Sequence, residues 1–147
     1  MKHLLFILII LSTFNSYGQT HDDKNEIIVF RLIGELSEEQ INNSGPRKLT
    51  FITNTNEART LADNDIANGT PFLLLMGGVT PSINSTDLEF EKRYQVYLYE
   101  FGDNGPDDKL AIAYNETIFE YLNNKYGKIW MRQIRKDVVG FNEWRKE

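Results

Sequence analysis

Residues 107–125 read DDKLAIAYNETIFEYLNNK and carry the clearest structural pattern in the chain. Asp107 and Asp108 stand where acidic side chains satisfy the free N–H groups at the start of a helix. Gly127 follows the pattern, and glycine commonly ends helices. The sequence therefore predicts a long amphipathic helix whose buried stripe recurs every three to four residues and consists of Leu110, Tyr114, Ile118, Tyr121 and Leu122.

A second helix is predicted over residues 129–138, where Trp130, Ile134 and Val138 recur at every fourth position. The short connection around Gly127 would make the two helices neighbours in a helical hairpin. We expect both apolar stripes to face a sheet, so that Trp130 belongs to the core.

The chain before residue 107 alternates between strand-like and helical patterns. Helices are expected at 37–43, where Ser37 and Gln40 match a capping box, from 55 to a stop at Asn68-Gly69, and at 88–93. Strands are expected where short runs are rich in β-branched, aromatic or other apolar residues and are bounded by turn residues, at 26–34, 48–53, 71–76 and 94–101.

We therefore expect a single α+β domain over residues 26–147, with about four strands in a mixed sheet, short connecting helices and a C-terminal helical hairpin. An α/β domain with a parallel sheet is the alternative, because helical segments separate the strands. The full length of 147 residues fits one domain rather than two.

The first 18 residues, MKHLLFILIILSTFNSYG, match a secretory signal peptide. Lys2 supplies the positive charge, the run from Leu4 to Leu11 is apolar, and Gly18 is a suitable residue before the cut. A transmembrane helix needs about 20 apolar residues, so this run is too short to be one. We expect a signal peptide over 1–18, a flexible leader over 19–25, and export to the periplasm or the extracellular space.

The chain has no cysteine and two histidines, His3 and His21. Thiol nucleophiles, cysteine-ligated zinc and iron–sulfur clusters are therefore excluded. Both histidines precede the expected domain, which argues against a Ser-His-Asp triad or a catalytic zinc site within it. We expect no cofactor and no metal, and we assign no catalytic residue.

Net charge is distributed unevenly along the chain. Residues 125–147 carry a net charge of +4, and residues 19–124 carry −10. The basic segment is rich in aromatic residues, a combination that also suits nucleic acid or a membrane surface. The acidic remainder would repel a polyanion, so we expect no nucleic-acid partner. A solvated helix face is the simplest interpretation, and the candidate interaction face comprises Tyr126, Lys128, Arg132, Arg135, Lys136 and Trp144.

Carboxylates supply the remaining candidate chemistry. The acidic loop 103–108 lacks the alternating spacing of a calcium loop, so helix initiation is the better interpretation. Glu116 and Glu120 lie one helical turn apart, a spacing compatible with glycoside hydrolysis. We expect Gly77-Gly78 to form a tight turn or a bulge, and Asp63-Asn64-Asp65 to lie on an exposed helix face.

Three segments resemble small exported bacterial proteins of unknown function. Such proteins often carry a cysteine after the Phe-Gly of the strand, where this chain has Asp103, so the resemblance implies no thiol role here. No catalytic residue is carried over from them. The resemblance covers about the last 60 residues and rests on residues 88–94, 96–102 and 121–130.

Export, small size and missing catalytic groups favour a non-catalytic binding module of the bacterial envelope, for example of the inhibitor or immunity type. Its expected partner is an envelope or secreted protein, and the chain is not expected to span a membrane. The alternative is a small carboxylate-dependent hydrolase that acts on cell-wall or other glycans.

The signal-peptide pattern predicts that the exported protein begins at Gln19. Intact-mass measurement of the exported fraction is expected to show the loss of residues 1–18. A full-length mass in that fraction would contradict the assignment.

Overall fold

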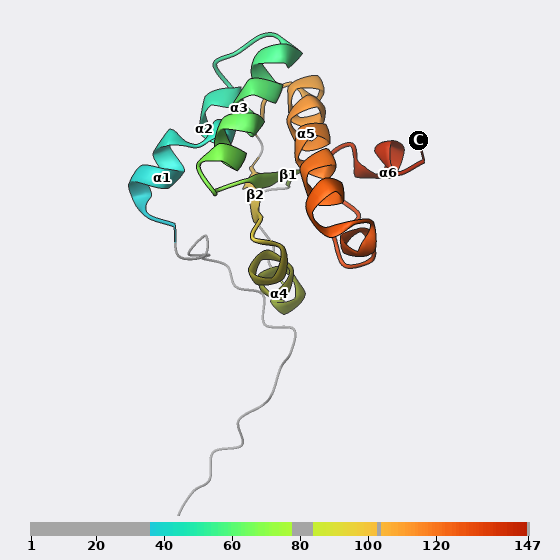
Figure 1. The fold of residues 1–147 in the computed structure, drawn as a ribbon. Coiled ribbons are helices and arrows are strands. Elements are labelled where there is room, and N and C mark those ends of the chain that lie inside the picture. Colours follow the sequence, from blue (N-terminus) through green and yellow to red (C-terminus); the bar gives the residue numbers. More distant parts are fainter. Residues whose placement is uncertain (1–35, 78–83, 103, 147) are drawn as a thin grey trace, which may run out of the picture.

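The structure, a computed structural model, describes residues 36–77, 84–102 and 104–146 (Figure 1). Its elements follow in the order α1 (Glu38–Asn43), α2 (Gly45–Leu49), α3 (Thr55–Ala67), β1 (Phe72–Met76), α4 (Ser85–Tyr94), β2 (Tyr97–Phe101), α5 (Asp108–Tyr126), the 3-10 turn η1 (Ile129–Arg132) and α6 (Phe141–Trp144).

Helices surround a small central sheet. The strands β1 and β2 pair in parallel, in a register that runs from Phe72 opposite Tyr97 to Met76 opposite Phe101. Helix α5 packs against both α3 and β1, and α2 packs against α3. Figure 1 shows α3 and α5 side by side, with the strands next to them and α4 beyond the strands. The first four residues of β1, Phe72 to Leu75, are buried, as expected for a strand covered on both faces.

The expectation of about four strands in a mixed sheet is wrong, because the described residues form one sheet of two parallel strands. They do not supply the larger parallel sheet of the α/β alternative either. The predicted strand 26–34 lies outside the described residues. The predicted strand 48–53 is instead the end of α2 and an exposed turn, because Pro46 starts a helix in this segment.

The predicted helix over 129–138 is also wrong. A helical turn covers only Ile129–Arg132, and Val138 then forms an antiparallel bridge with Leu75. The Val139 N–H donates to the carbonyl of Leu74 at 3.1 Å, so this backbone pairs with β1 instead of continuing a helix. Trp130, Ile134 and Val138 are nevertheless all buried, so the apolar pattern identified core residues but not their secondary structure.

Several local predictions are confirmed. Ser37 and Gln40 form the capping box of α1, and Gly127 ends α5 with a positive φ of 65°. Asn68 caps the end of α3, as the Asn-Gly stop predicted. Trp130 has no exposed surface and packs in an aromatic cluster with Phe119, Phe141 and Trp144.

The side chain of Asn115 occupies the edge of β1 that faces away from β2. Its Oδ1 accepts from the Leu74 N–H at 2.8 Å, and its Nδ2 donates to the Leu74 carbonyl at 3.0 Å and to the Val139 carbonyl at 2.9 Å. The carboxamide therefore replaces a peptide group of a neighbouring strand. Asn115 also begins the sequence Asn115-Glu116-Thr117, which matches the N-glycosylation pattern, but its 0% exposure rules out modification in the folded state.

We predict that Asn115→Leu strongly destabilises the protein, because the Leu74 N–H and the Val139 carbonyl lose their side-chain partner, while the Leu74 carbonyl keeps only the Val139 N–H. Each unsatisfied buried group costs about 1–3 kcal/mol. The matched control is Asn124→Leu on the exposed face of α5, expected to change stability by about 0.5 kcal/mol or less. Urea denaturation followed by circular dichroism measures both, and equal midpoints for the two variants would contradict the role of Asn115.

Candidate functional site

A cavity of about 440 Å³ opens between α4 and the segment that follows η1. We call it the α4 groove. Helix α4 contributes one wall and residues 132–136 contribute the other. The α4 residues that line it are Thr86, Asp87, Glu89, Phe90 and Arg93.

Three contacts from different parts of the chain hold α4 in place. The Glu91 carboxylate accepts from the Leu98 N–H of β2 at 2.7 Å. The Tyr126 hydroxyl at the end of α5 donates to the Tyr94 carbonyl at 3.0 Å. Asp87 pairs with Arg135 across the groove. The wall formed by α4 is therefore anchored to the sheet, to α5 and to the C-terminal segment.

The Arg135 side chain is itself held by two carboxylates. Its Nη1 lies 3.2 Å from Asp87 Oδ2, and its Nε donates to Asp137 Oδ1 at 2.9 Å while its Nη2 also pairs with Asp137. The Asp137 carboxylate raises the pKa of Arg135, and the guanidinium in turn lowers the pKa of Asp137. With 17% of its side chain exposed, Arg135 joins the two walls of the groove.

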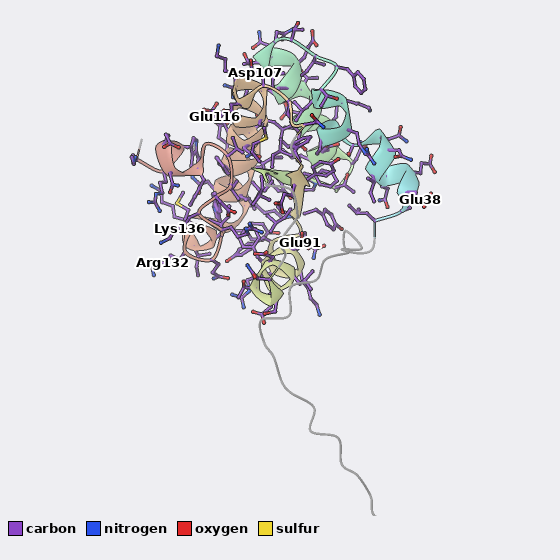
Figure 2. The ribbon with its side chains drawn as sticks, turned by 180° about the vertical axis from the view of Figure 1, so that it is seen from behind. Glu38, Glu91, Asp107, Glu116, Arg132 and Lys136 are labelled. Carbon is purple, nitrogen blue, oxygen red and sulfur yellow. The ribbon has the colours of Figure 1, made fainter. Side chains whose placement is uncertain are left out.

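The charged rim of the groove lies around an apolar floor. Phe90 and Ile134 are buried at the bottom. Arg93 Nη1 donates to Gln133 Oε1 at 2.7 Å, which places a third cation beside Arg132 and Lys136. Within the described part of the chain, none of these three cations forms an ion pair. Figure 2 shows Arg132 and Lys136 close together on the same side of the molecule.

The structure brings together half of the predicted interaction face. Arg132, Arg135 and Lys136 line the α4 groove. The other three predicted residues do not line it: Tyr126 packs edge-on against Tyr94, Trp144 packs on Phe119 and Trp130, and Lys128 is exposed beyond the end of α5.

Sequence reasoning missed the contribution of α4, which supplies Phe90 and Arg93. The Lys92-Arg93 pair near the end of a predicted helix was a visible charge signal. No local spacing relates it to residues 132–136, because only the tertiary fold places the two segments opposite each other.

The predicted carboxylate sites have other roles. Asp107 Oδ1 accepts from the Lys109 N–H at 2.9 Å, which confirms that the described part of the acidic loop initiates α5. Glu116 pairs with Arg59 at 2.8 Å, and Glu120 is exposed on the same helix. Neither glutamate lines the α4 groove. In the described ranges, no group of three or more acidic or histidine side chains could hold a metal ion.

Gly77 continues the strand pairing rather than turning sharply. Its N–H donates to the Phe101 carbonyl at 3.0 Å. Gly78, the second glycine of the predicted turn, lies outside the described residues.

The expectation that Asp63-Asn64-Asp65 lies on an exposed helix face is wrong for Asp65, because this residue is only 3% exposed. Its carboxylate accepts from the Gly45 N–H at 2.8 Å and from the Tyr114 hydroxyl at 2.5 Å, so it caps α2 and joins α2 to α3 and α5. Burial raises the pKa of Asp65 from 3.8 to about 6. The spacing of Ala58, Ala62 and Asp65 follows the buried stripe of α3, which is the sequence signal that could have located it.

A search of protein-family models, of curated proteins and of solved structures finds no match to this chain. The resemblance to small exported bacterial proteins therefore stays a prediction. No helix among the described residues is long and apolar enough to cross a membrane.

The buried position of Asp65 predicts that the stability of the folded protein depends on pH. Its folded pKa of about 6 exceeds the ordinary 3.8, so the folded state binds this proton more tightly than the unfolded chain. Protonated Asp65 therefore stabilises the folded state relative to the unfolded chain. This contribution to the free energy of unfolding is fully present below about pH 4 and is lost as the pH rises through 6. It amounts to about 3 kcal/mol, because one pKa unit corresponds to about 1.36 kcal/mol.

We expect Asp65→Asn to remove this contribution, so that the free energy of unfolding changes less between pH 4 and pH 7 than in the wild type. Asp63→Asn on the exposed face of the same helix is the control and is expected to keep the wild-type profile. Urea titrations at several pH values measure the difference. Parallel profiles for Asp65→Asn and the wild type would show that Asp65 does not titrate in this range.

Proposed function

We propose that this protein is a small exported, non-catalytic binding module that recognises an acidic segment of an envelope or secreted protein through the α4 groove. The observation that carries the proposal is the cationic rim of Arg93, Arg132 and Lys136 over the buried floor of Phe90 and Ile134. An inhibitor or immunity protein would act by this kind of contact.

The charge of the groove supports an acidic partner. Four cations and two carboxylates, Asp87 and Glu89, line the groove. Three of the cations have no carboxylate partner within the described ranges, whereas residues 19–124 as a whole carry −10. Complementary charge steers encounter and disfavours wrong partners. Arginine is also among the residues that contribute most at protein interfaces.

The remaining acidic surface favours a short segment of a protein over a long polyanion. A polyanion that extended past the groove would meet the acidic body of the protein and be repelled. A folded partner that places a few acidic and apolar side chains in the groove would avoid this repulsion. Apolar side chains of the partner would be buried against the floor of Phe90 and Ile134, a contribution that a purely electrostatic site would lack.

Export rests on the signal-peptide pattern of residues 1–18, which lie outside the described residues together with the predicted leader. A periplasmic or extracellular location would bring the groove into contact with envelope and secreted proteins.

The proposal predicts binding of a short labelled peptide of glutamate and leucine, measured by fluorescence anisotropy at low and at high salt. Affinity is expected to fall with salt, because exposed charges are screened. The double variant Arg132→Glu/Lys136→Glu is expected to bind about tenfold more weakly or worse. The same peptide with glutamine in place of glutamate is expected not to bind.

The matched control is Lys128→Glu/Lys146→Glu, which makes the same charge change at exposed positions outside the groove. It is expected to bind within about twofold of the wild type. Equal loss in both double variants would mean that net charge rather than the groove governs binding, and no binding by the wild type would refute the proposal. Circular dichroism confirms that each variant is folded.

A further inference from the structure

A second cavity, of about 540 Å³, lies where β2 and α2 both end. Its walls come from α2 and the following turn on one side and from the end of β2 on the other. It shares no lining residue with the α4 groove. Ligand sites in parallel sheets commonly lie at the carboxyl ends of the strands, and this cavity opens at that end of β2.

An aromatic ring stands open to solvent in this cavity. Phe51 is 85% exposed, more than any other large apolar side chain in the described residues. Its backbone N–H donates to the Lys48 carbonyl at 3.0 Å, so a turn holds the residue in place. Burying a phenylalanine side chain is favourable, and here that contribution is available to a ligand that packs on the ring.

Two cations, Arg47 and Lys48, line the same cavity as this ring. Neither forms an ion pair with another side chain in the described ranges. Both are exposed in the last turn of α2, where cations also complement the free carbonyl groups of the helix. That role would affect stability only, whereas a role in ligand binding would affect affinity.

The opposite wall comes from the end of β2. Glu100 contributes to this wall, and its side chain packs so closely on Gly77 that a Cβ at position 77 would lie 2.6 Å from its Cδ. A negatively charged group would be attracted to the α2 wall, where Arg47 and Lys48 lie.

The α2 wall is preorganised. Asp65 binds the Gly45 N–H at the start of α2, and a Cβ at position 45 would lie 2.8 Å from the Tyr114 ring and 2.5 Å from Asp65 Oδ2. Helix α2 is therefore packed tightly against α3 and α5. A wall that does not need ordering on binding lowers the entropic cost of association.

We infer that this cavity binds a small planar aromatic carboxylate, with its ring on Phe51 and its anionic group on Arg47 and Lys48. Each part of the ligand corresponds to one feature of the cavity: the flat ring to the exposed aromatic side chain, and the negative charge to the two cations.

The test is a titration of the isotope-labelled protein with naphthoate, followed by proton–nitrogen correlation spectra. Shifts are expected to concentrate in residues 46–51, 99–102 and 104. Cyclohexanecarboxylate has the same charge without a flat ring, and naphthalenemethanol has the ring without the charge. Both are expected to bind about tenfold more weakly than naphthoate or worse.

Two variants separate the contributions. Phe51→Ser is expected to weaken naphthoate binding by about tenfold, whereas Ile129→Ser, at another exposed apolar side chain outside the cavity, is expected to leave it unchanged. Arg47→Gln/Lys48→Gln is expected to weaken naphthoate binding while leaving that of naphthalenemethanol unchanged.

Shifts spread over the whole protein, equal binding of the three probes, or equal loss in Phe51→Ser and Ile129→Ser would each overturn the inference. A change in the urea midpoint of Arg47→Gln/Lys48→Gln without a change in naphthoate affinity would assign the two cations to helix stability, and would overturn it as well. None of these results bears on the α4 groove, because the two sites share no residue.

Discussion

The carboxamide of Asn115 joins the three parts of the chain that form the core. From the middle of α5 it pairs with both backbone groups of Leu74 in β1 and with the carbonyl of Val139 in the C-terminal segment. A sheet of two strands is not stable on its own in water and needs helices or further strands to cover it. Here one side chain supplies the missing backbone partner, so α5 can pack directly on β1.

The same linkage positions the α4 groove. Because Val138 and Val139 pair with β1, the residues just before them cross the molecule beside α4 instead of continuing a helix. Arg135 then reaches Asp87 and closes the gap between the two walls. The basic residues that follow η1 therefore lie against α4, over the apolar floor of Phe90 and Ile134.

A second buried polar contact, one residue earlier in α5, joins further parts of the chain. Asp65 holds the start of α2 through Gly45 and bonds to Tyr114 of α5, although burial raises its pKa to about 6. An ionised carboxylate is costly in this position, and its hydrogen bonds offset part of that cost. The contact gives α2 a defined place, and α2 forms one wall of the cavity beside Phe51.

The sequence by itself determined the elements whose signals are local. The apolar stripe and Asp107 located α5, the capping box located α1, and the short apolar run located β1, because each pattern depends on residues within a few positions of one another. Tertiary structure alone decided the rest. In the folded protein, residues 48–53 form the end of a helix and an exposed turn. The segment around Val138 pairs with the edge of β1, and α4 lies opposite residues 132–136. Each of these outcomes depends on side-chain and backbone contacts between positions far apart in the chain, such as Asp65 with Gly45 and Asn115 with Val139, which local periodicity does not encode.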